Sequence, residues 1–102
     1  AVDFVTDGQR DAWIEGGSPL MPLNTALGCS LTALCGAYAA VAEDPFDATV
    51  AALVHFAVAG QRAGQGAEGP GSFAPRFLDA LHAVTPADLA VAVVRHAESA
   101  PA

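Results

Sequence analysis

The segment from Asn24 to Leu34 holds the residues whose types and spacing could best support chemistry. Its sequence predicts a strand-like stretch that ends, a turn at Gly28, and a helix of small residues that begins at once. The first backbone N–H groups of a helix have no partner within it, and their partial positive charge attracts a phosphate. Cys29 lies on this first turn, where the same charge lowers the pKa of a thiol. The run therefore predicts an anion site beside a reactive sulfur.

Composition restricts the partners that the chain can have. The sequence has 102 residues, of which 53% are hydrophobic, and this suits one small domain or a piece of a larger one. Its net charge is −7, with four Lys and Arg residues in total, so we expect neither nucleic acid nor an anionic membrane surface as a partner. No run reaches the roughly 18 apolar residues of a membrane span, and no signal peptide is visible. These features predict a cytoplasmic protein.

The two cysteines are predicted to stay reduced. Cys29 and Cys35 lie six residues apart in one predicted helix, which places them on different faces, and this spacing does not match a zinc pair. Cys35 is predicted to pack in the core. The three histidines share no metal-like spacing and are predicted at the surface or the core edge. Side-chain spacing therefore predicts no metal site.

The first part of the chain is predicted as a short β meander. Val2–Thr6 and Arg10–Glu15 have the composition of strands, and Asp7 with Gly8 is a turn signal between them. Pro19–Leu23 is predicted as a third, edge-like strand, because its prolines cannot donate to a ladder.

Everything after Gly28 is predicted as helix. Apolar residues recur at helical spacing from Gly28 to Ala42, and Asp44 followed by Pro45 is a typical start for a second helix. That helix is expected to stop near Gly64, where a glycine-rich loop begins. The other expected features are a third helix capped by Ser72, and a fourth opened by a capping box at residues 85–88, with Leu89, Ala92, Val93 and His96 on its face.

Three short strands followed by four apolar-striped helices make a poor independent unit. A small ribbon of strands needs more sheet beside it, and helices with apolar faces need a sheet to cover. Residues 1–102 are therefore predicted as one portion of a larger α/β domain, with no internal boundary.

Several motifs resemble the hydroxyethylthiazole kinase family, in order and in register. Thr25–Cys29, followed by Leu31–Leu34, is similar to the family's T-G-x-G-C signature. Ala39–Phe46 is similar to its A-A-V-E-E-x-P segment, and Gly69–Phe73 resembles its G-P-G-S-F box. Val2–Gly8 resembles the strand that follows the family's nucleotide-contacting threonine. The resemblance implies the C-terminal part of a ribokinase-like, three-layer α/β/α fold.

The resemblance also implies a reaction and a set of site residues. The family transfers the γ-phosphate of ATP, with Mg2+, to the primary alcohol of 4-methyl-5-(2-hydroxyethyl)thiazole in thiamine biosynthesis, as a homotrimer with sites between subunits. Phosphate or nucleotide contacts are then expected at Thr25, Leu27, Gly28 and Ser30. Cys29 is expected to orient or deprotonate the substrate hydroxyl. Ala26 stands where the family's first glycine contacts the thiazole.

Two departures from the family pattern leave alternatives open. A Cβ at Ala26 excludes glycine-only backbone angles, and Leu27 adds bulk beside the phosphate path. One alternative is therefore a noncatalytic remnant that keeps the fold without turnover; another is a free-standing thiol protein that uses Cys29 as a redox sensor. The box at Gly69–Phe73 is either a loop capped by Ser72 or a loop that closes one side of the nucleotide or trimer surface.

Overall fold

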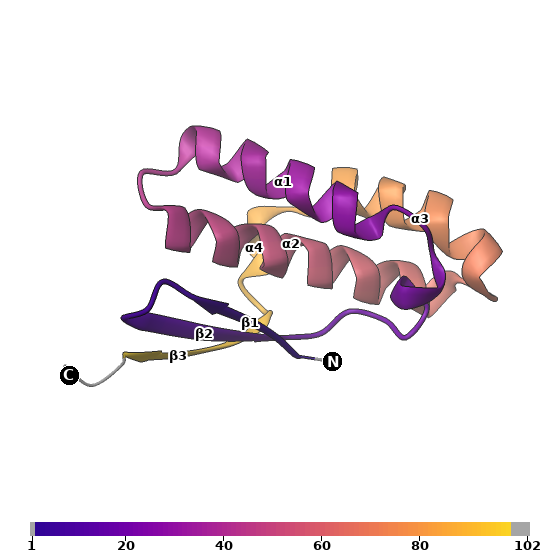
Figure 1. The fold of residues 1–102 in the computed structure, drawn as a ribbon. Coiled ribbons are helices and arrows are strands. Elements are labelled where there is room, and N and C mark those ends of the chain that lie inside the picture. The colour runs from indigo at the N-terminus through magenta and orange to yellow at the C-terminus, as the bar shows by residue number, and fades with distance from the viewer. Residues whose placement is uncertain (1, 99–102) are drawn as a thin grey trace.

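A three-stranded antiparallel sheet carries helices on one face (Figure 1). The computed structural model describes residues 2–98. The elements in chain order are β1 (Val2–Thr6), β2 (Arg10–Glu15), the 3-10 helix η1 (Met21–Leu23), α1 (Leu27–Val41), α2 (Pro45–Gly66), α3 (Pro70–Ala83), α4 (Pro86–Leu89) and β3 (Val93–Glu98).

The β1–β2 hairpin forms as the sequence predicts. Val2 lies opposite Glu15 and Thr6 opposite Asp11. The turn is closed by Asp7, whose Oδ1 accepts from the backbone N–H groups of Gln9 at 2.9 Å and Arg10 at 2.6 Å. These bonds, and the guanidinium of Arg10, lower the pKa of Asp7 to about 2. Asp7 therefore shapes this turn, as expected.

The strand predicted at Pro19–Leu23 is wrong. This segment instead turns into η1, with the Leu23 N–H donating to the Leu20 carbonyl at 3.2 Å and the Asn24 N–H to the Met21 carbonyl at 3.1 Å. Two prolines among five residues fix φ near the helical and turn value and remove ladder donors. The segment is therefore a compact connection and not a strand.

The third strand of the sheet comes from the end of the chain, where the sequence predicted helix. The predicted capping box is present, since Thr85 and Asp88 bond to each other's backbone N–H groups. The helix nevertheless ends at Leu89. β3 then pairs antiparallel with β2, with Val94 opposite Ile14. The valines there favour a strand once a partner strand is available, and that partner lies about 80 residues away in sequence.

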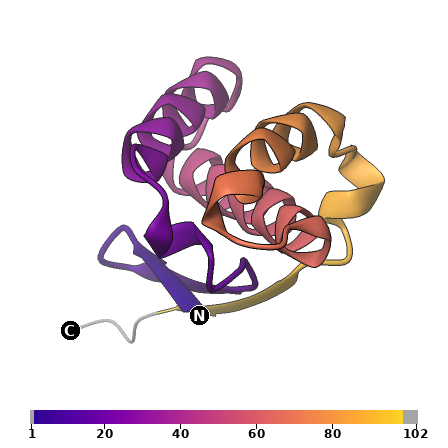
Figure 2. The ribbon, with the colours of Figure 1, turned by 90° about the vertical axis from the view of Figure 1, so that its right-hand side faces the viewer.

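α2 is the central helix of the molecule (Figure 2). One face packs on the sheet through a cluster that contains Ile14, Phe46 and Leu53. Another face packs on α3, where Phe56 meets Phe77 edge-on with ring centroids 4.8 Å apart. α1 packs beside α2 but has no fully buried residue. α1 is therefore held mainly by its contacts with α2.

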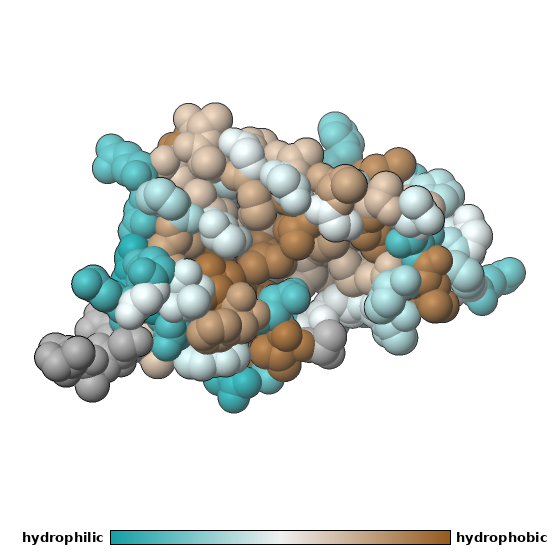
Figure 3. Space-filling model, viewed as in Figure 1, coloured by the Kyte–Doolittle hydropathy of each residue, from teal (hydrophilic) through white to brown (hydrophobic). Residues whose placement is uncertain are grey.

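The opposite face of the sheet is not covered by the described residues. Phe4 is 53% exposed and Val93 52% exposed, and the Phe4 ring lies beside that of Trp13, 5.2 Å away between ring centroids. Residues 2–98 thus supply sheet and one helical layer. On the face shown in Figure 3, apolar side chains gather over α1 and α2 while hydrophilic ones lie mostly toward the two ends. None of the helices in residues 2–98 combines the length and apolar character needed to cross a membrane.

Candidate functional site

The start of α1 is set by a left-handed turn at Ala26. Its φ of 68° and ψ of 11° lie in the region that glycine favours, and no other non-glycine residue between 2 and 98 has a positive φ. The prediction that Gly28 makes this turn is wrong, because Gly28 lies inside α1. A Cβ is compatible with this conformation at a cost of roughly 1–2 kcal/mol. Ala26 therefore adopts the left-handed turn with a strained backbone conformation.

The first turn of α1 leaves its backbone donors available. No side chain caps the helix, and no acidic residue lies in its first turn. The Ser30 N–H and hydroxyl both donate to the Ala26 carbonyl at 3.0 Å. The N–H groups of residues 27–29 have no acceptor carbonyl within the helix. They are the donors that this helix start can offer to an anion.

The predicted site residues surround this turn but differ in exposure. Thr25, Ala26, Gly28 and Cys29 are exposed, and Ser30 is half-buried. Leu27 packs its side chain against the core cluster that contains Phe73 and Phe77. The side chain of Leu27 is therefore directed at least partly toward the core. Cys29 and the free backbone donors share one accessible turn.

A hollow of about 190 Å³ lies beside the first turns of α1. It is bounded by Asp3 of β1, Gly17 before η1, Met21 of η1, Leu31 of α1 and Phe56 of α2. No motif in the sequence indicated this hollow. Its walls come from β1, the stretch of residues 16–22, α1 and α2, so no local pattern could have indicated it.

The box at Gly69–Phe73 begins a helix. Gly69 is the N-cap of α3 and Ser72 lies within the helix, so the prediction that Ser72 caps it is wrong. α2 continues to Gly66, so the predicted glycine-rich loop is shorter than expected. The Ser72 hydroxyl accepts from the Glu68 N–H at 3.0 Å and donates to the Gly69 carbonyl at 3.3 Å. Phe73 is fully buried. These local bonds account for the box as a helix start.

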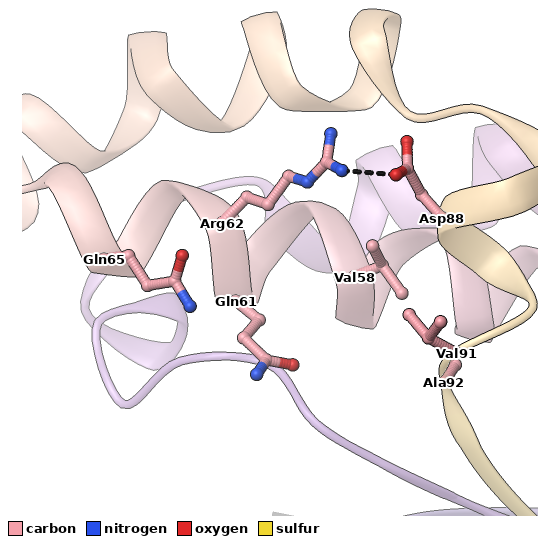
Figure 4. A pocket seen from close by; sticks show the side chains of 7 residues that line it. All are labelled: Val58, Gln61, Arg62, Gln65, Asp88, Val91 and Ala92. Atoms are coloured by element: carbon pink, nitrogen blue, oxygen red, sulfur yellow. Dashed lines mark ion pairs between the residues drawn. The ribbon is translucent and has the colours of Figure 1, made fainter.

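A second hollow lies between α2 and the chain around α4 (Figure 4). Its walls include Gln61, Gln65 and Val91, and its one cation, Arg62, forms an ion pair with Asp88 across it. The Thr85 N–H and hydroxyl lower the pKa of Asp88, as does Arg62. Because both charges are already paired, this hollow offers less to an anion than the start of α1 does.

A half-buried hydrogen-bond chain joins the three long helices. His55 Nε2 lies 2.8 Å from the Leu81 carbonyl and, because a carbonyl only accepts, donates to it. Its Nδ1 lies 2.8 Å from the hydroxyl of Tyr38, whose pKa is raised by burial. Within residues 2–98, no three His, Cys, Asp or Glu side chains gather as a metal site. His55 thus fits a packing role.

Comparison with known proteins gives the family. The profile of the Hydroxyethylthiazole kinase family matches residues 1–87. The chain belongs to the hydroxyethylthiazole kinase family. It is 71% identical over 85 residues to the hydroxyethylthiazole kinase of Rhizobium leguminosarum bv. trifolii, an alignment that covers 82% of this chain and 32% of that protein. It is 68% identical over 89 residues to that of Gemmatimonas aurantiaca, covering 87% and 32%.

A solved structure extends the likeness to the fold. The hydroxyethylthiazole kinase of Pyrococcus horikoshii superposes with a TM-score of 0.90 at 38% identity, over 96% of this chain and 39% of that one. This confirms the predicted α/β fold class and the resemblance read from the motifs. The chain spans about a third of the length of the hydroxyethylthiazole kinases it matches in sequence.

Proposed function

We propose that this chain supplies the phosphate-binding part of a hydroxyethylthiazole kinase. The reaction is transfer of the γ-phosphoryl group of ATP to the primary alcohol of 4-methyl-5-(2-hydroxyethyl)thiazole. The observation that carries the proposal is the uncapped, exposed start of α1 in a chain of this family. Residues 1–102 act as one portion of a single kinase domain, in a cytoplasmic homotrimer.

The backbone donors of residues 27–29 would hold the oxygens of the transferring phosphoryl group. Phosphoryl transfer depends mainly on in-line positioning and stabilisation of charge, which fixed N–H donors provide. Thr25 and the rotatable hydroxyl of Ser30 flank these donors. Ala26, whose backbone makes the turn, lies where the alcohol substrate would approach.

Cys29 would act on the substrate hydroxyl. The alcohol oxygen forms the new bond to the γ-phosphorus as the bond to the ADP oxygen breaks, and the alcohol proton leaves. The sulfur of Cys29 can accept or direct that proton, because its side chain is exposed on the same turn.

The described residues do not form a site for Mg2+. Mg2+ in such reactions is held by one or two carboxylates together with the phosphates. The first turn of α1 has no acidic residue, and Asp3 is the one carboxylate among the residues that line the nearby hollow.

The noncatalytic alternative rested on Ala26 and Leu27. Leu27 turns into the core and Ala26 keeps the left-handed turn, so neither residue as placed favours loss of activity.

The test is an assay of the complete encoded polypeptide. ADP release should depend on the thiazole alcohol and should disappear with 5-ethyl-4-methylthiazole, which lacks the hydroxyl. Absence of alcohol-dependent ADP release from a folded protein would contradict the proposal and favour the noncatalytic alternative.

A further inference from the structure

α2 carries two glycines, Gly60 and Gly64, one turn apart and facing the segment between β2 and α1. A Cβ on Gly60 would lie 2.5 Å from the sulfur of Met21, and one on Gly64 would lie 2.5 Å from Ser18 Oγ and 2.8 Å from Ser18 Cβ. Real Cβ atoms essentially never come within 3.0 Å of another heavy atom in this way. The segment therefore lies closer to α2 than any other residue type would allow.

The two contacts differ in how easily the neighbouring atoms could move away from an added Cβ. Met21 can move the far end of a flexible side chain, whereas the Cβ of Ser18 moves only with its backbone. Glycine in a helix interior is normally less favourable than alanine. Ser18 occupies the space that a side chain at position 64 would need, and this explains why the position is glycine.

A shift at Ser18 would be passed along the segment to the start of α1. The Ser18 hydroxyl accepts from the Leu20 N–H at 3.2 Å, and the Asn24 side-chain amide donates to the Leu20 carbonyl at 2.9 Å. The Asn24 N–H donates to the Met21 carbonyl at 3.1 Å. Asn24 stands two residues before the left-handed turn at Ala26.

From these contacts we infer that Gly64, with support from Gly60, is a positioning residue for the phosphate site. It acts through Ser18 and the segment of residues 18–24, which fixes where the first turn of α1 lies. The inference rests on the proposed function, because the start of α1 matters for turnover only if it binds the phosphoryl group.

The test begins with a readout that does not require activity. In the complete polypeptide, Gly64→Ala should accelerate hydrogen exchange of the Leu23 and Asn24 amides by roughly tenfold or more, because their bonds depend on the docked segment. Gly66→Ala is the matched control on the same helix, since its Cβ would meet only the long, flexible side chain of Arg76, with Nη1 nearest at 2.8 Å. It should leave those amides unchanged.

The second readout is kinetic. Gly64→Ala should lower kcat by about 10- to 100-fold, as expected for a misplaced reacting group, while Gly66→Ala should not. Ser18→Gly removes both atoms that a Cβ at position 64 would strike. The double variant Ser18→Gly with Gly64→Ala should therefore return to within about threefold of Ser18→Gly alone, a rescue that nonspecific loss of packing would not give.

The outcomes separate the two claims. Unchanged exchange at Leu23 and Asn24 in Gly64→Ala overturns the inference. Faster exchange in Gly64→Ala with unchanged kcat would show that Gly64 does not position the phosphate site. Failure of the double variant to regain the kcat of Ser18→Gly would show the same. If the unaltered protein shows no alcohol-dependent ADP release, the proposed function fails, and the exchange result still decides whether Gly64 holds the segment.

Discussion

The starts of α1 and α2 are built in opposite ways. At α2, the Asp44 carboxylate accepts from the Phe46 N–H at 2.9 Å, and Arg10 pairs with Asp44 at 2.7 Å and lies over the Phe46 ring at 4.5 Å. At α1, the helix begins after a left-handed Ala26 with neither a side-chain cap nor an acidic residue. The start of α2 is satisfied internally, and the start of α1 is open to a ligand.

This difference indicates what each helix start is for. An N-cap side chain typically stabilises a helix by about 0.5–2 kcal/mol. α1 lacks that stabilisation, although asparagine, threonine and serine, which are good N-cap residues, lie close to its start. Free donors are of use where a negatively charged group must bind, so the comparison supports an anion site at α1 and a structural role for the start of α2.

The largest effect is expected at Cys29. Cys29→Ala in the complete polypeptide should lower kcat by about 100-fold, the usual contribution of a group that handles a proton. The melting temperature should hardly change, because Cys29 is exposed. Cys35→Ala, in the same helix but half-buried, should leave kcat unchanged. An unaltered rate in Cys29→Ala would remove this residue from the mechanism.

A charge at Gly28 should convert the open helix start into one that resembles α2. Gly28→Asp should stabilise the helix start by about 0.3–1 kcal/mol through the helix dipole, and should raise the KM for ATP about tenfold by repelling the phosphate. Gly28→Asn has the same size without the charge, and a Cβ at this position has open space around it. Equal KM values for the Asp and Asn variants would argue against a phosphate at this turn.

Acid should weaken the hairpin and the start of α2. Hydrogen bonds from the Arg10 and Gln9 amides, together with Arg10, lower the pKa of Asp7 from 3.8 to about 2, and Arg10 with the Phe46 amide lowers that of Asp44. A lowered pKa in the folded state means stability that is present above about pH 4 and is lost as the pH falls toward 2. Urea midpoints measured from pH 5 to pH 2 should show this fall.

The control for the acid effect is Asp7→Asn. Its urea midpoint should be lower than that of the unaltered protein at pH 5 and should change less between pH 4 and pH 2. Parallel curves for the two proteins would mean that other carboxylates dominate the acid response.

The smallest effect is expected at Ala26. Ala26→Gly should raise the free energy of unfolding by about 0.5–1 kcal/mol, because glycine adopts a positive φ without strain. Ala33→Gly, in the exposed interior of α1, should lower it by about 0.5–1 kcal/mol. Urea unfolding compares the two. If Ala26→Gly loses turnover while it gains stability, the alanine is adapted to the site.

Local signals predicted the parts of the fold that depend on neighbouring residues. The Asp44–Pro45 start of α2, the capping box at Thr85 and Asp88, and the Asp7 turn all form as expected, because each is made by hydrogen bonds over two to four residues. The apolar spacing from Gly28 to Ala42 placed the start of α1 within one residue of the observed Leu27.

The errors arose where distant contacts decide. Val93–Glu98 becomes a strand only because β2 lies beside it. At Pro19–Leu23, the prolines that predicted an edge strand suit a turn as well, and the segment packs on α2 at Gly60. The left-handed conformation of Ala26 was not expected from a residue with a Cβ. The hollow beside α1 needs walls from several elements, which no sequence window contains.

The most direct measurement is a crystal structure of the complete polypeptide with a nonhydrolysable ATP analogue and the thiazole alcohol. The terminal phosphate oxygens should lie about 2.7–3.2 Å from the backbone nitrogens of residues 27–29, with the substrate hydroxyl beside Cys29. A terminal phosphate bound elsewhere, with those nitrogens facing solvent or protein alone, would contradict the proposal.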